Sequence, residues 1–292
     1  MDKIDFLLES PVCRIETPFD LSAHSTIGCG GLAKAAFYPE TPMQLQTIVQ
    51  CLREREIPFY VVGNMSNVLP SEGISQRVFI VTRRLKTVEE ENVFFGAGVT
   101  VGGLLKTLKK MGKSGAEFLA GIPCTLGGAL YLNAGAAGVY ISEIVESVAV
   151  LRNGKIVVLS LSECGYAYKT SIFMQNDDVI VGAKLRLVAS DKEKIEKEIE
   201  RYANRRAHLP KGKSMGCVFK NPEGESAGKL IEGTGLKGMR VGGVKVSEQH
   251  ANFILNDNHA TPEQIKTLIE IIKNAVFAQY KIRLQEEIQY LD

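Results

Sequence analysis

The chain has 292 residues, of which 45% are apolar and 23% are charged, and its formal net charge is +2. This length and composition are typical of a globular protein of about two domains, each able to bury a core. The near-zero charge, with no run of lysines or arginines, excludes the clustered basic face of a nucleic-acid-binding protein. No apolar stretch approaches the ~20 residues of a transmembrane helix, and segment 1–11 lacks the features of a signal peptide.

The six cysteines and four histidines are dispersed along the chain. None of the cysteines forms a C-x-x-C pair, so we expect no metal site. Thiols in this arrangement fit a reducing compartment, and most of them are expected to be small buried apolar side chains. The pattern therefore predicts a cytoplasmic protein.

Periodicity and capping signals predict the first elements in chain order. Thr41 and Pro42 begin a helix, because threonine caps well and proline suits the first helical position. Short apolar runs predict strands at 59–62, 77–81 and 93–95. A helix is expected over 101–111, and Asn153–Gly154 predicts the turn of a hairpin over 148–159.

The composition of the chain changes near residue 190. A long strand is expected over 178–188, and the strongly charged segment 190–206 is expected to be helical. Thr261 and Pro262 repeat the capping pattern before a helix whose apolar residues recur on one side. The tail, 282–291, is interpreted as a final strand. Together these elements predict an α+β chain in two parts that divide near residue 190.

A loop rich in glycine and asparagine, Gly63–Asn67, follows the strand predicted at 59–62. Such a loop can turn successive backbone N–H groups towards one anion, and its polar side chains add further donors. The alternative is an ordinary surface turn. The residues alone leave both interpretations open.

The segment Gly121–Gly138 carries no charge over 18 residues and contains five glycines and four alanines. Small residues allow a backbone to approach a flat ligand closely, and Pro123 disfavours an uninterrupted helix. The alternative is a tightly packed internal crossover without a ligand. Two matches to the dinucleotide fingerprint, at 28–33 and 233–238, lack the strand before and the helix after that it requires, so both are interpreted as turns.

The segment Ser214–Pro222 places one thiol, that of Cys217, shortly before an aromatic residue, a lysine and an asparagine. A thiol that faces a glycine-rich ligand cradle is a candidate proton donor. The alternative is that Cys217 is one more buried structural thiol.

Taken together, these segments resemble the UDP-N-acetylenolpyruvoylglucosamine reductase family in its short form (type II). The order and spacing of the matching stretches agree over nearly the whole chain. These stretches are 25–31, 63–67, 96–98, 117–123, 127–128, 133–135, 166–171, 216–222, 227–232, 242–243, 250–253 and 284–288.

The resemblance implies a fold and its division into domains. The implied fold is α+β, with a two-subdomain FAD-binding module of the vanillyl-alcohol-oxidase type and an α+β substrate-binding domain. We expect the FAD-binding domain at 1–190, with subdomains of about 1–85 and 86–190. The UDP-sugar-binding domain is expected at 191–292, with its C-terminal strand returning to the active site.

The resemblance also assigns binding residues. The 63–67 loop would hold the pyrophosphate of a non-covalent FAD, and the 121–135 stretch would flank its isoalloxazine. The implied FAD-binding residues are Gly63, Asn64, Met65, Ser66, Asn67, Gly121, Ile122, Thr125, Gly128, Asn133 and Gly135. The implied substrate-binding residues are Lys211, Asn221 and His250.

The implied activity is that of a UDP-N-acetylmuramate dehydrogenase in peptidoglycan precursor synthesis. NADPH gives hydride to FAD, and reduced FAD gives hydride to the terminal carbon of an enolpyruvyl ether. Negative charge then develops on the inner carbon and its carboxylate, so fixed electrophiles must stabilise it. A positioned acid must also protonate the inner carbon.

Three residues are implied to carry this chemistry, and two of them depart from the family pattern. Cys217 stands where the family has a serine proton donor, and a thiol with an ordinary pKa of ~8.5 still carries its proton at neutral pH. Lys169 stands where the family usually has an arginine that contacts the substrate carboxylate, so the charge is kept and the bidentate fork is lost. Glu287 matches the third catalytic residue, although Glu286 is one register position away.

Non-catalytic roles remain open for these residues, and other functions remain open for the chain. Lys169 could be a surface lysine at a strand end, and both glutamates could be solvated strand charges. The chain could be a catalytically impaired flavin- or nucleotide-binding paralogue, or an oxidase of the same flavin fold. The expected partners are small molecules, namely the UDP-sugar enolpyruvyl ether and NADPH, with no nucleic acid and no membrane span. We expect a monomer.

Overall fold

The computed structural model describes residues 12–292, which form two compact units that each draw on separate stretches of the chain. The first unit contains Ala35–Asn64 and Arg77–Ala207, together with the described residues up to Thr17. The second unit contains Pro18–Lys34, Met65–Gln76 and His208–Asp292. Segment 1–11, for which no signal peptide is expected, lies outside the described residues.

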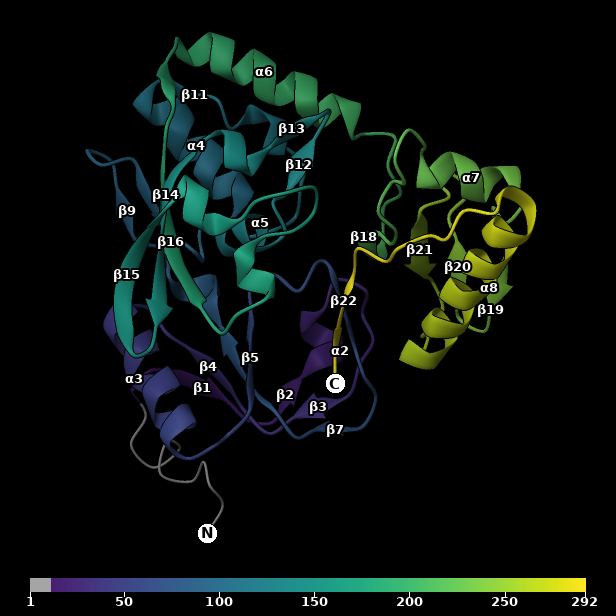
Figure 1. Ribbon diagram of the computed structural model, residues 1–292, viewed down its shortest axis with the longest axis horizontal. Helices are drawn as coiled ribbons and strands as arrows, with labels where there is room; N and C mark the ends of the chain where they lie inside the picture. Colours follow the sequence, from purple (N-terminus) through teal and green to yellow (C-terminus); the bar gives the residue numbers. More distant parts are fainter. Residues whose placement is uncertain (1–11) are drawn as a thin grey trace. The chain divides into compact units, whose positions relative to one another are not determined.

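Two sheets form the framework of the first unit (Figure 1). The smaller sheet has the order β1-β4-β8-β5, with strands β1 (Arg14–Glu16), β4 (Ala36–Tyr38), β8 (Val78–Val81) and β5 (Phe59–Val62). The larger sheet has the order β15-β14-β16-β10-β9, with strands β15 (Lys155–Ser160), β14 (Val145–Arg152), β16 (Val179–Leu185), β10 (Phe94–Gly96) and β9 (Val88–Glu89). Two short ladders pair β11 (Lys113–Ser114) with β17 (Val188–Ala189), and β12 (Gly135–Ala136) with β13 (Val139–Tyr140).

Helices cover both faces of the larger sheet. Along β14, Val148 and Val150 contribute to the core with α4 (Val101–Met111) and α5 (Leu126–Tyr131), whereas Ala149 and Leu151 contribute to the core with α3 (Pro42–Glu54). This alternation is that of a strand buried on both sides. Helix α6 (Lys192–Arg205) packs on the α4–α5 side through Ile199, Tyr202 and Ala203. The 3-10 helices are η1 (Thr82–Arg84), η2 (Glu117–Leu119), η3 (Ile141–Glu143), η4 (Leu161–Cys164) and η5 (Ile172–Met174).

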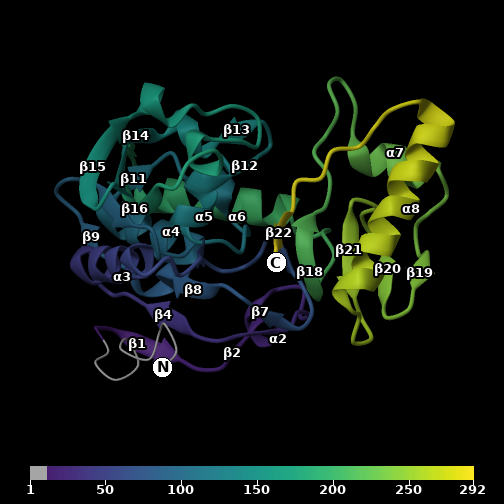
Figure 2. The ribbon, with the colours of Figure 1, turned by 60° about the horizontal axis from the view of Figure 1, so that its bottom comes forward.

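The second unit combines a sheet from the C-terminal third of the chain with two shorter segments from its beginning. The sheet has the order β18-β21-β20-β19, with strands β18 (Lys213–Cys217), β21 (Phe253–Asn256), β20 (Val244–Val246) and β19 (Arg240–Val241). Helices α7 (Ala227–Gly233) and α8 (Pro262–Tyr280) pack on it (Figure 2). A second small sheet consists of β2 (Phe19–Asp20), β3 (Leu32–Ala33) and β7 (Ile74–Ser75), with α2 (Leu21–His24) between β2 and β3.

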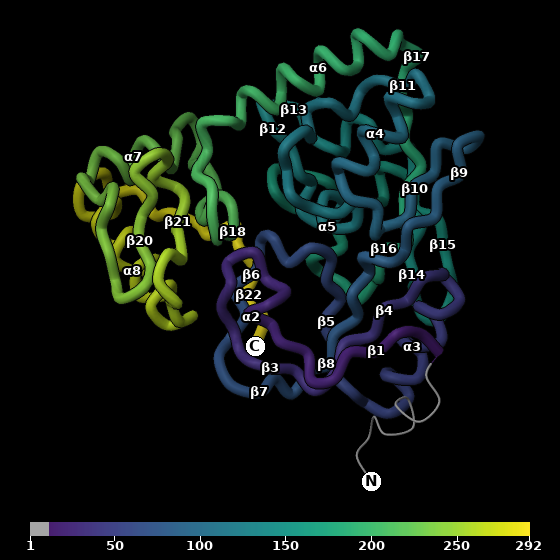
Figure 3. Tube along the Cα trace, turned by 180° about the vertical axis from the view of Figure 1, so that it is seen from behind, coloured from purple at the N-terminus to yellow at the C-terminus, as the bar shows by residue number. Residues whose placement is uncertain are grey.

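The C-terminal strand of the second unit joins a distant part of the sequence. Strand β22 (Gln289–Leu291) pairs in parallel with β6 (Val68–Pro70), and the two run side by side in Figure 3. One core binds the unit together, because Ile27 and Leu69 are fully buried among residues of β18, β20, α7 and α8. Within residues 12–292, no helix is both long and apolar enough to cross a membrane.

Most locally encoded elements are confirmed. Helix α3 begins after Thr41, whose side chain accepts from the N–H of Gln44, and α8 begins with a full capping box at Thr261. The expected helices at 101–111 and 190–206 are α4 and α6. The predicted hairpin is β14–β15, and its turn residues Asn153 and Gly154 both have positive φ, as a type I′ turn requires. The α+β class is therefore confirmed.

The structure corrects two predicted strands. Regular pairing over the segment predicted at 178–188 ends with β16 at Leu185, and β17 then pairs elsewhere. The tail is predicted as one strand over 282–291, but only β22 (Gln289–Leu291) is a regular strand, and it pairs with β6. Earlier in the tail, Glu286 forms only an isolated bridge with Phe219. A strand that changes partners cannot be recognised from its own apolar pattern.

The two units also differ from the domain boundary expected near residue 190. Helix α6 belongs with the first unit because its apolar side packs on that core, so the first unit extends to Ala207. Segments 18–34 and 65–76 belong with the C-terminal residues, because β3 and β6 pair within the second unit. The assignment of FAD to 1–190 and of the UDP-sugar to 191–292 stays a prediction.

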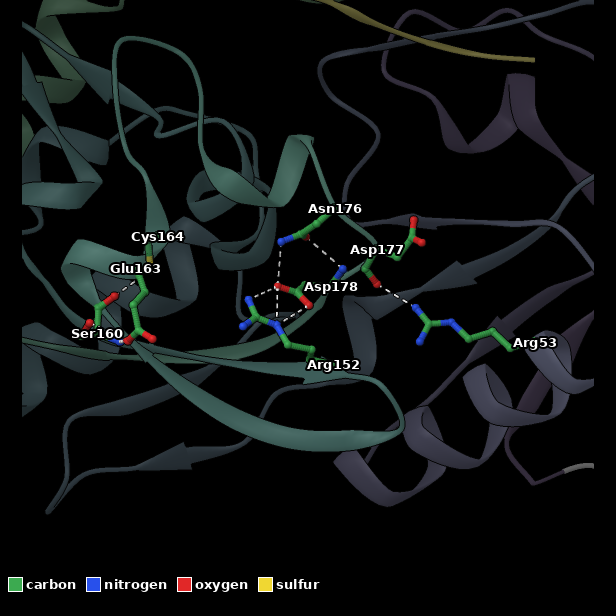
Figure 4. A network of polar contacts seen from close by, with 8 residues as sticks. All are labelled: Arg53, Arg152, Ser160, Glu163, Cys164, Asn176, Asp177 and Asp178. Carbon is green, nitrogen blue, oxygen red and sulfur yellow. Dashed lines mark hydrogen bonds and ion pairs between the residues drawn. The ribbon is translucent and has the colours of Figure 1, made fainter.

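A polar network fixes the start of β16 beside the hairpin (Figure 4). Arg152 at the end of β14 donates three hydrogen bonds to the carboxylate of Asp178, two from Nε at 3.0 and 3.3 Å and one from Nη2 at 2.7 Å. The side chain of Asn176 donates to the same carboxylate, and Arg53 at the end of α3 donates to the carbonyl of Asp177 at 2.8 Å. The network joins α3, β14 and the loop before β16 at one corner of the first unit.

We predict that Gly154→Ala lowers the free energy of unfolding by about 1 kcal/mol, because Gly154 has φ of +73° and an alanine there is strained. A Cβ at this position would meet nothing within 4 Å, so the cost is conformational. Chemical denaturation of both proteins measures the difference.

Gly102→Ala provides the matched control. Gly102 lies in the first turn of α4, is exposed and also has open space around its Cβ position, but its backbone is helical. Alanine should therefore stabilise the protein by about 0.5 kcal/mol. Equal effects of the two substitutions would contradict the type I′ assignment.

Candidate active site

The loop after β5 offers backbone donors. Within residues 12–292, the backbone N–H groups of Asn64, Met65 and Ser66 donate no hydrogen bond. Met65 has φ of +49°, a left-handed conformation of the kind that occurs in anion-binding loops. Such donors need an acceptor, and a pyrophosphate supplies one. The loop therefore fits the predicted pyrophosphate-binding role of Gly63–Asn67.

Side chains and close packing fix the beginning of this loop. Asn64 donates from Nδ2 to the carbonyl of Pro123 at 2.9 Å. A Cβ on Gly63 would lie 2.3 Å from the Thr125 Oγ1, so only glycine allows this approach. These contacts bring the start of the 63–67 loop against the predicted 121–135 stretch within the first unit.

The end of the loop is fixed within the second unit. The carbonyl of Met65 accepts from the N–H of Thr26 at 3.2 Å. Asn67 donates from Nδ2 to the carbonyl of Glu287 at 3.0 Å, and its own carbonyl accepts from the N–H of Gln289 at 2.9 Å. A predicted FAD residue, Asn67, thus touches the backbone of a predicted catalytic residue, Glu287.

The 121–135 stretch is a short helix flanked by turns. Thr125 is fully buried and caps α5 by accepting from the N–H of Gly128 at 3.4 Å, while Ile122 packs against the core of the first unit. Burial raises the pKa of the Cys124 thiol to about 12, and the nearby charges of Arg206 and Lys169 oppose that rise. The positive charges therefore belong to the surroundings of this stretch.

Lys169 occupies the tip of a tight turn and not a strand end. Ala167 and Thr170 exchange two backbone hydrogen bonds of 3.2 Å, so Tyr168 and Lys169 form a two-residue turn. Lys169 has φ of +54°, which is uncommon for a residue with a side chain. Such strain persists only where the surroundings impose it, and it is concentrated at functional sites.

Two buried side chains hold this turn in place. Asn133 donates from Nδ2 to the carbonyl of Ala167 at 2.9 Å and accepts from the N–H of Ser142 at 3.2 Å. Ser171 donates to the carbonyl of Tyr131 at 2.6 Å. The Asn133 side chain thus binds the Lys169 turn, and its predicted contact with FAD would fall to other atoms of the residue. Gly135, also predicted to bind FAD, begins the neighbouring strand β12.

Cys217 lies at the end of β18 immediately after a β-bulge. Ser214 pairs with Leu255 and Cys217 with Phe253, so β18 has one extra residue between these pairs. Gly216 supplies the bulge conformation with φ of +75°. Bulges of this kind re-aim the side chains that follow them and occur next to active sites. The thiol is half-buried.

The two neighbouring glutamates of the tail, Glu286 and Glu287, have different contacts. Glu286 forms an ion pair with Lys273 of α8 at 3.1 Å and accepts from the hydroxyl of Tyr290. Glu287 has only 9% of its surface exposed, and its N–H donates to the carbonyl of Val218 at 2.7 Å. Glu286 thus serves the packing of α8, whereas Glu287 is adjacent to the Cys217 strand. This arrangement favours Glu287 over Glu286 as the functional glutamate.

The predicted substrate residues Asn221 and His250 both lie at the start of α7. Asn221 accepts at Oδ1 from the N–H of Ala227 at 3.0 Å. The ring of His250 packs against Gly228 and edge-on against Phe253, and burial, followed by the charge of His208, lowers its pKa. The structure thus brings these two residues together, while Lys211 is exposed in the loop before β18.

Sequence reasoning missed three residues in this region. Gly216 forms the bulge, and its position directly before Cys217 was the signal that could have suggested it. Asn252 is 3% exposed and hydrogen bonds to Phe219, although its place in the matching 250–253 stretch did not reveal a role. Arg206 lies with its Cδ 3.3 Å from the Cβ position of Gly121, and no sequence pattern indicates that contact.

Comparison with known proteins agrees with this geometry. Residues 33–160 match a family described as FAD binding domain, and residues 207–291 match a family described as UDP-N-acetylenolpyruvoylglucosamine reductase, C-terminal domain. Reductases of that name from Caldanaerobacter subterraneus and Clostridioides difficile are each 34% identical, over 99% and 98% of this chain and 97% and 95% of their own. The reductase from Desulforamulus reducens is 38% identical over 92% of this chain and 90% of its own.

A solved structure supports the same relationship. The UDP-N-acetylenolpyruvylglucosamine reductase of Thermus caldophilus superposes with a TM-score of 0.83 at 33% identity, covering 96% of this chain and 99% of its own. The FAD-binding match covers the 63–67 loop and the 121–135 stretch, whose backbone donors and close packing suit that cofactor. The chain therefore belongs to the UDP-N-acetylenolpyruvoylglucosamine reductase family of FAD-dependent oxidoreductases of peptidoglycan synthesis.

Proposed function

We propose that the protein catalyses the NADPH-dependent reduction of UDP-N-acetylglucosamine enolpyruvate to UDP-N-acetylmuramate. The observation that carries this proposal is that motif residues far apart in sequence, Asn67, Cys217 and Glu287, belong to one hydrogen-bonded arrangement of the second unit. FAD, held by the 63–67 loop and the 121–135 stretch, would supply the hydride chemistry that connects NADPH to the enolpyruvyl double bond.

Cys217 is the proposed proton donor to the carbon beside the carboxylate. The bulge at Gly216 supports this role, because it gives the thiol a direction that a regular strand would not. A thiol is a stronger acid than a hydroxyl, so a cysteine can take over the serine of the family pattern. After the transfer the thiolate regains its proton from solvent.

Lys169 and Glu287 are the proposed partners of the developing negative charge and the carboxylate. The strained Lys169 turn, held by Asn133 and Ser171, supports a fixed ammonium group. A fixed charge stabilises a transition state better than a mobile one, since it needs no reorganisation. Lys211, Asn221 and His250 are proposed to contact the UDP-sugar, with Lys211 acting as a point charge for phosphate.

The proposal extends to surroundings and partners. The substrate and NADPH are small molecules, and we place the enzyme in the cytoplasm, where both would be available to it. We further propose that the active form is a monomer, since the motif residues assigned to FAD and to the sugar nucleotide all belong to one chain. Size-exclusion chromatography with light scattering checks this last point.

We predict that the purified protein is yellow and oxidises NADPH when the enolpyruvyl substrate is present. Cys217→Ala should slow reduction of the sugar at least about 100-fold, because general acid catalysis is typically of that size. Hydride transfer from NADPH to FAD should remain, as followed by bleaching of the flavin in a stopped-flow instrument.

Cys217→Ser is the matched control, and it should keep most of the activity because serine restores an acidic proton. An inactive parent protein that still binds FAD would favour the impaired paralogue. Turnover of an alcohol with oxygen would favour an oxidase. Full activity of Cys217→Ala would remove Cys217 from the mechanism.

We predict that Gly216→Ala slows sugar reduction more than its effect on stability explains. The Cβ would meet nothing within 4 Å, but φ of +75° strains an alanine by about 1 kcal/mol, and relief of that strain shifts the bulge. Gly235→Ala is the matched control, since Gly235 has φ of +74° and equally open space. The two variants should melt alike, and equal rates of sugar reduction in both would contradict the role of the bulge.

We predict that Lys169→Met lowers the rate of sugar reduction about 100-fold, because a charge aimed at the developing anion is lost. Lys169→Arg should keep most of the rate, since the charge remains. Single-turnover oxidation of the reduced flavin by substrate measures both variants. A rate for Lys169→Met equal to that of the parent would assign Lys169 to the surface.

A further inference from the structure

Asn252 is buried, and both hydrogen bonds of its side chain are made with the backbone of Phe219, two residues after Cys217. It is 3% exposed, and its Oδ1 accepts from the N–H of Phe219 at 2.9 Å while its Nδ2 donates to the carbonyl of Phe219 at 2.8 Å. Its carbonyl also accepts from the N–H of Val218 at 2.9 Å, and its N–H donates to Nδ1 of His250 at 3.3 Å.

The Asn252 side chain replaces a missing strand neighbour. Regular pairing of β18 with β21 ends at Cys217 and Phe253, and the chain bends at Val218. A carboxamide presents one donor and one acceptor in nearly the same arrangement as a peptide group. Asn252 therefore extends the ladder to Phe219, two residues beyond Cys217, where the pairing with β21 ends.

The opposite edge of the same segment binds the strand of Glu287. The carbonyl of Val218 accepts from the N–H of Glu287 at 2.7 Å, and the N–H of Lys220 donates to the carbonyl of Gln285 at 2.8 Å. Phe219 itself pairs with Glu286. The segment 218–220 is thus held by Asn252 on one side and carries residues 285–287 on the other.

We propose that Asn252 is a positioning residue, which fixes the backbone of Cys217 and, through residues 218–220, that of Glu287. This inference rests on the proposed function, because it concerns the placement of the proposed proton donor. It assigns Asn252 no contact with substrate or FAD. Loss of the carboxamide would leave the peptide of Phe219 without partners on that edge and let the segment shift.

The chain offers a matched control for the stabilising effect of a buried amide. Asn256 lies four residues further along, is 5% exposed and forms three side-chain hydrogen bonds, compared with two for Asn252. Those bonds reach Ile27, Gly28 and Ala260, none of which lies next to Cys217 in the sequence. Asn252→Ala and Asn256→Ala therefore remove similar interactions at different places.

The experiment compares the FAD-loaded full chain carrying either substitution. Both variants should lower Tm by a few degrees, as loss of a buried hydrogen-bonded amide does. In Asn252→Ala, oxidation of the reduced flavin by the enolpyruvyl substrate should slow about 10- to 100-fold, the scale of a misplaced catalytic group. Its solvent deuterium isotope effect should rise, because proton transfer becomes slower, whereas reduction of FAD by NADPH should change less than about twofold.

A readout independent of turnover accompanies the kinetics. Amide hydrogen exchange at Phe219 and Glu287 should accelerate in Asn252→Ala and stay unchanged in Asn256→Ala. If Asn252→Ala does not fold, Asn252→Ser replaces it, since serine keeps a polar group at the position and costs less stability. Asn252→Ser should also slow oxidation of the flavin by substrate, raise the isotope effect and accelerate amide exchange, each by less than Asn252→Ala would.

The outcomes separate this inference from the function on which it rests. Equal rates and equal isotope effects in the two alanine variants would overturn the positioning role, even with Cys217→Ala inactive. Full sugar reduction by Cys217→Ala would instead overturn the proposed proton donor. A slowed Asn252→Ala with an elevated isotope effect, beside a normal Asn256→Ala, supports the inference.

Discussion

The buried backbone of residues 218–220 must satisfy its hydrogen bonds where neither neighbour is a regular strand. Val218 and Phe219 are 0% and 1% exposed, so water cannot serve their peptide groups. A buried peptide group without a partner costs about 1–3 kcal/mol, and two or three of them would exceed what the unit can tolerate. The carboxamide of Asn252 and the backbone of the tail supply the partners. The placement of Cys217, the bridge of Glu286 and the course of the tail towards β6 all follow from this requirement.

The two departures from the family pattern, Lys169 for arginine and Cys217 for serine, both lie at positions where the backbone conformation is constrained. An arginine orients a carboxylate through its rigid fork, whereas a lysine ammonium has no preferred direction of its own. In this protein, Asn133 and Ser171 anchor the turn that carries Lys169, so the backbone of the lysine is fixed. In the same way, the Gly216 bulge directs the Cys217 side chain. Both proposed roles thus depend on backbone geometry more than on the shape of the side chain.

Elements decided by a few neighbouring residues could be predicted from the sequence. Thr41 and Thr261 with their following prolines began α3 and α8, and Asn153–Gly154 formed the hairpin turn, because capping and turn chemistry act locally. The partners of β6 and β22 could not be predicted, since 221 positions separate Leu291 from Pro70 and no local signal encodes the pairing. The tail prediction failed for the same reason.

The candidate site was predictable as a set of residues and not as an arrangement. The order of the motifs indicated Cys217, Lys169 and Glu287 as catalytic candidates and the 63–67 loop as a candidate FAD-binding segment. The motifs did not show that the side-chain amide of Asn133 donates a hydrogen bond to the Lys169 turn, or that Glu286 forms an ion pair with Lys273. Polar side chains that bind backbone look identical in sequence to those that bind ligands, because the same amide or carboxylate serves both purposes.

The interleaved construction of the second unit has a consequence for how the chain folds as it is synthesised. Ile27, Cys29 and Leu69 belong to a core whose remaining buried members are supplied by residues 215–288. These early apolar side chains leave the ribosome long before their partners exist, while the first unit can close once Ala207 has emerged. Contacts of such high sequence separation form slowly, so the late-closing unit is exposed to aggregation during synthesis. The second unit, which carries Cys217 and Glu287, is thus the last part of the protein to become native.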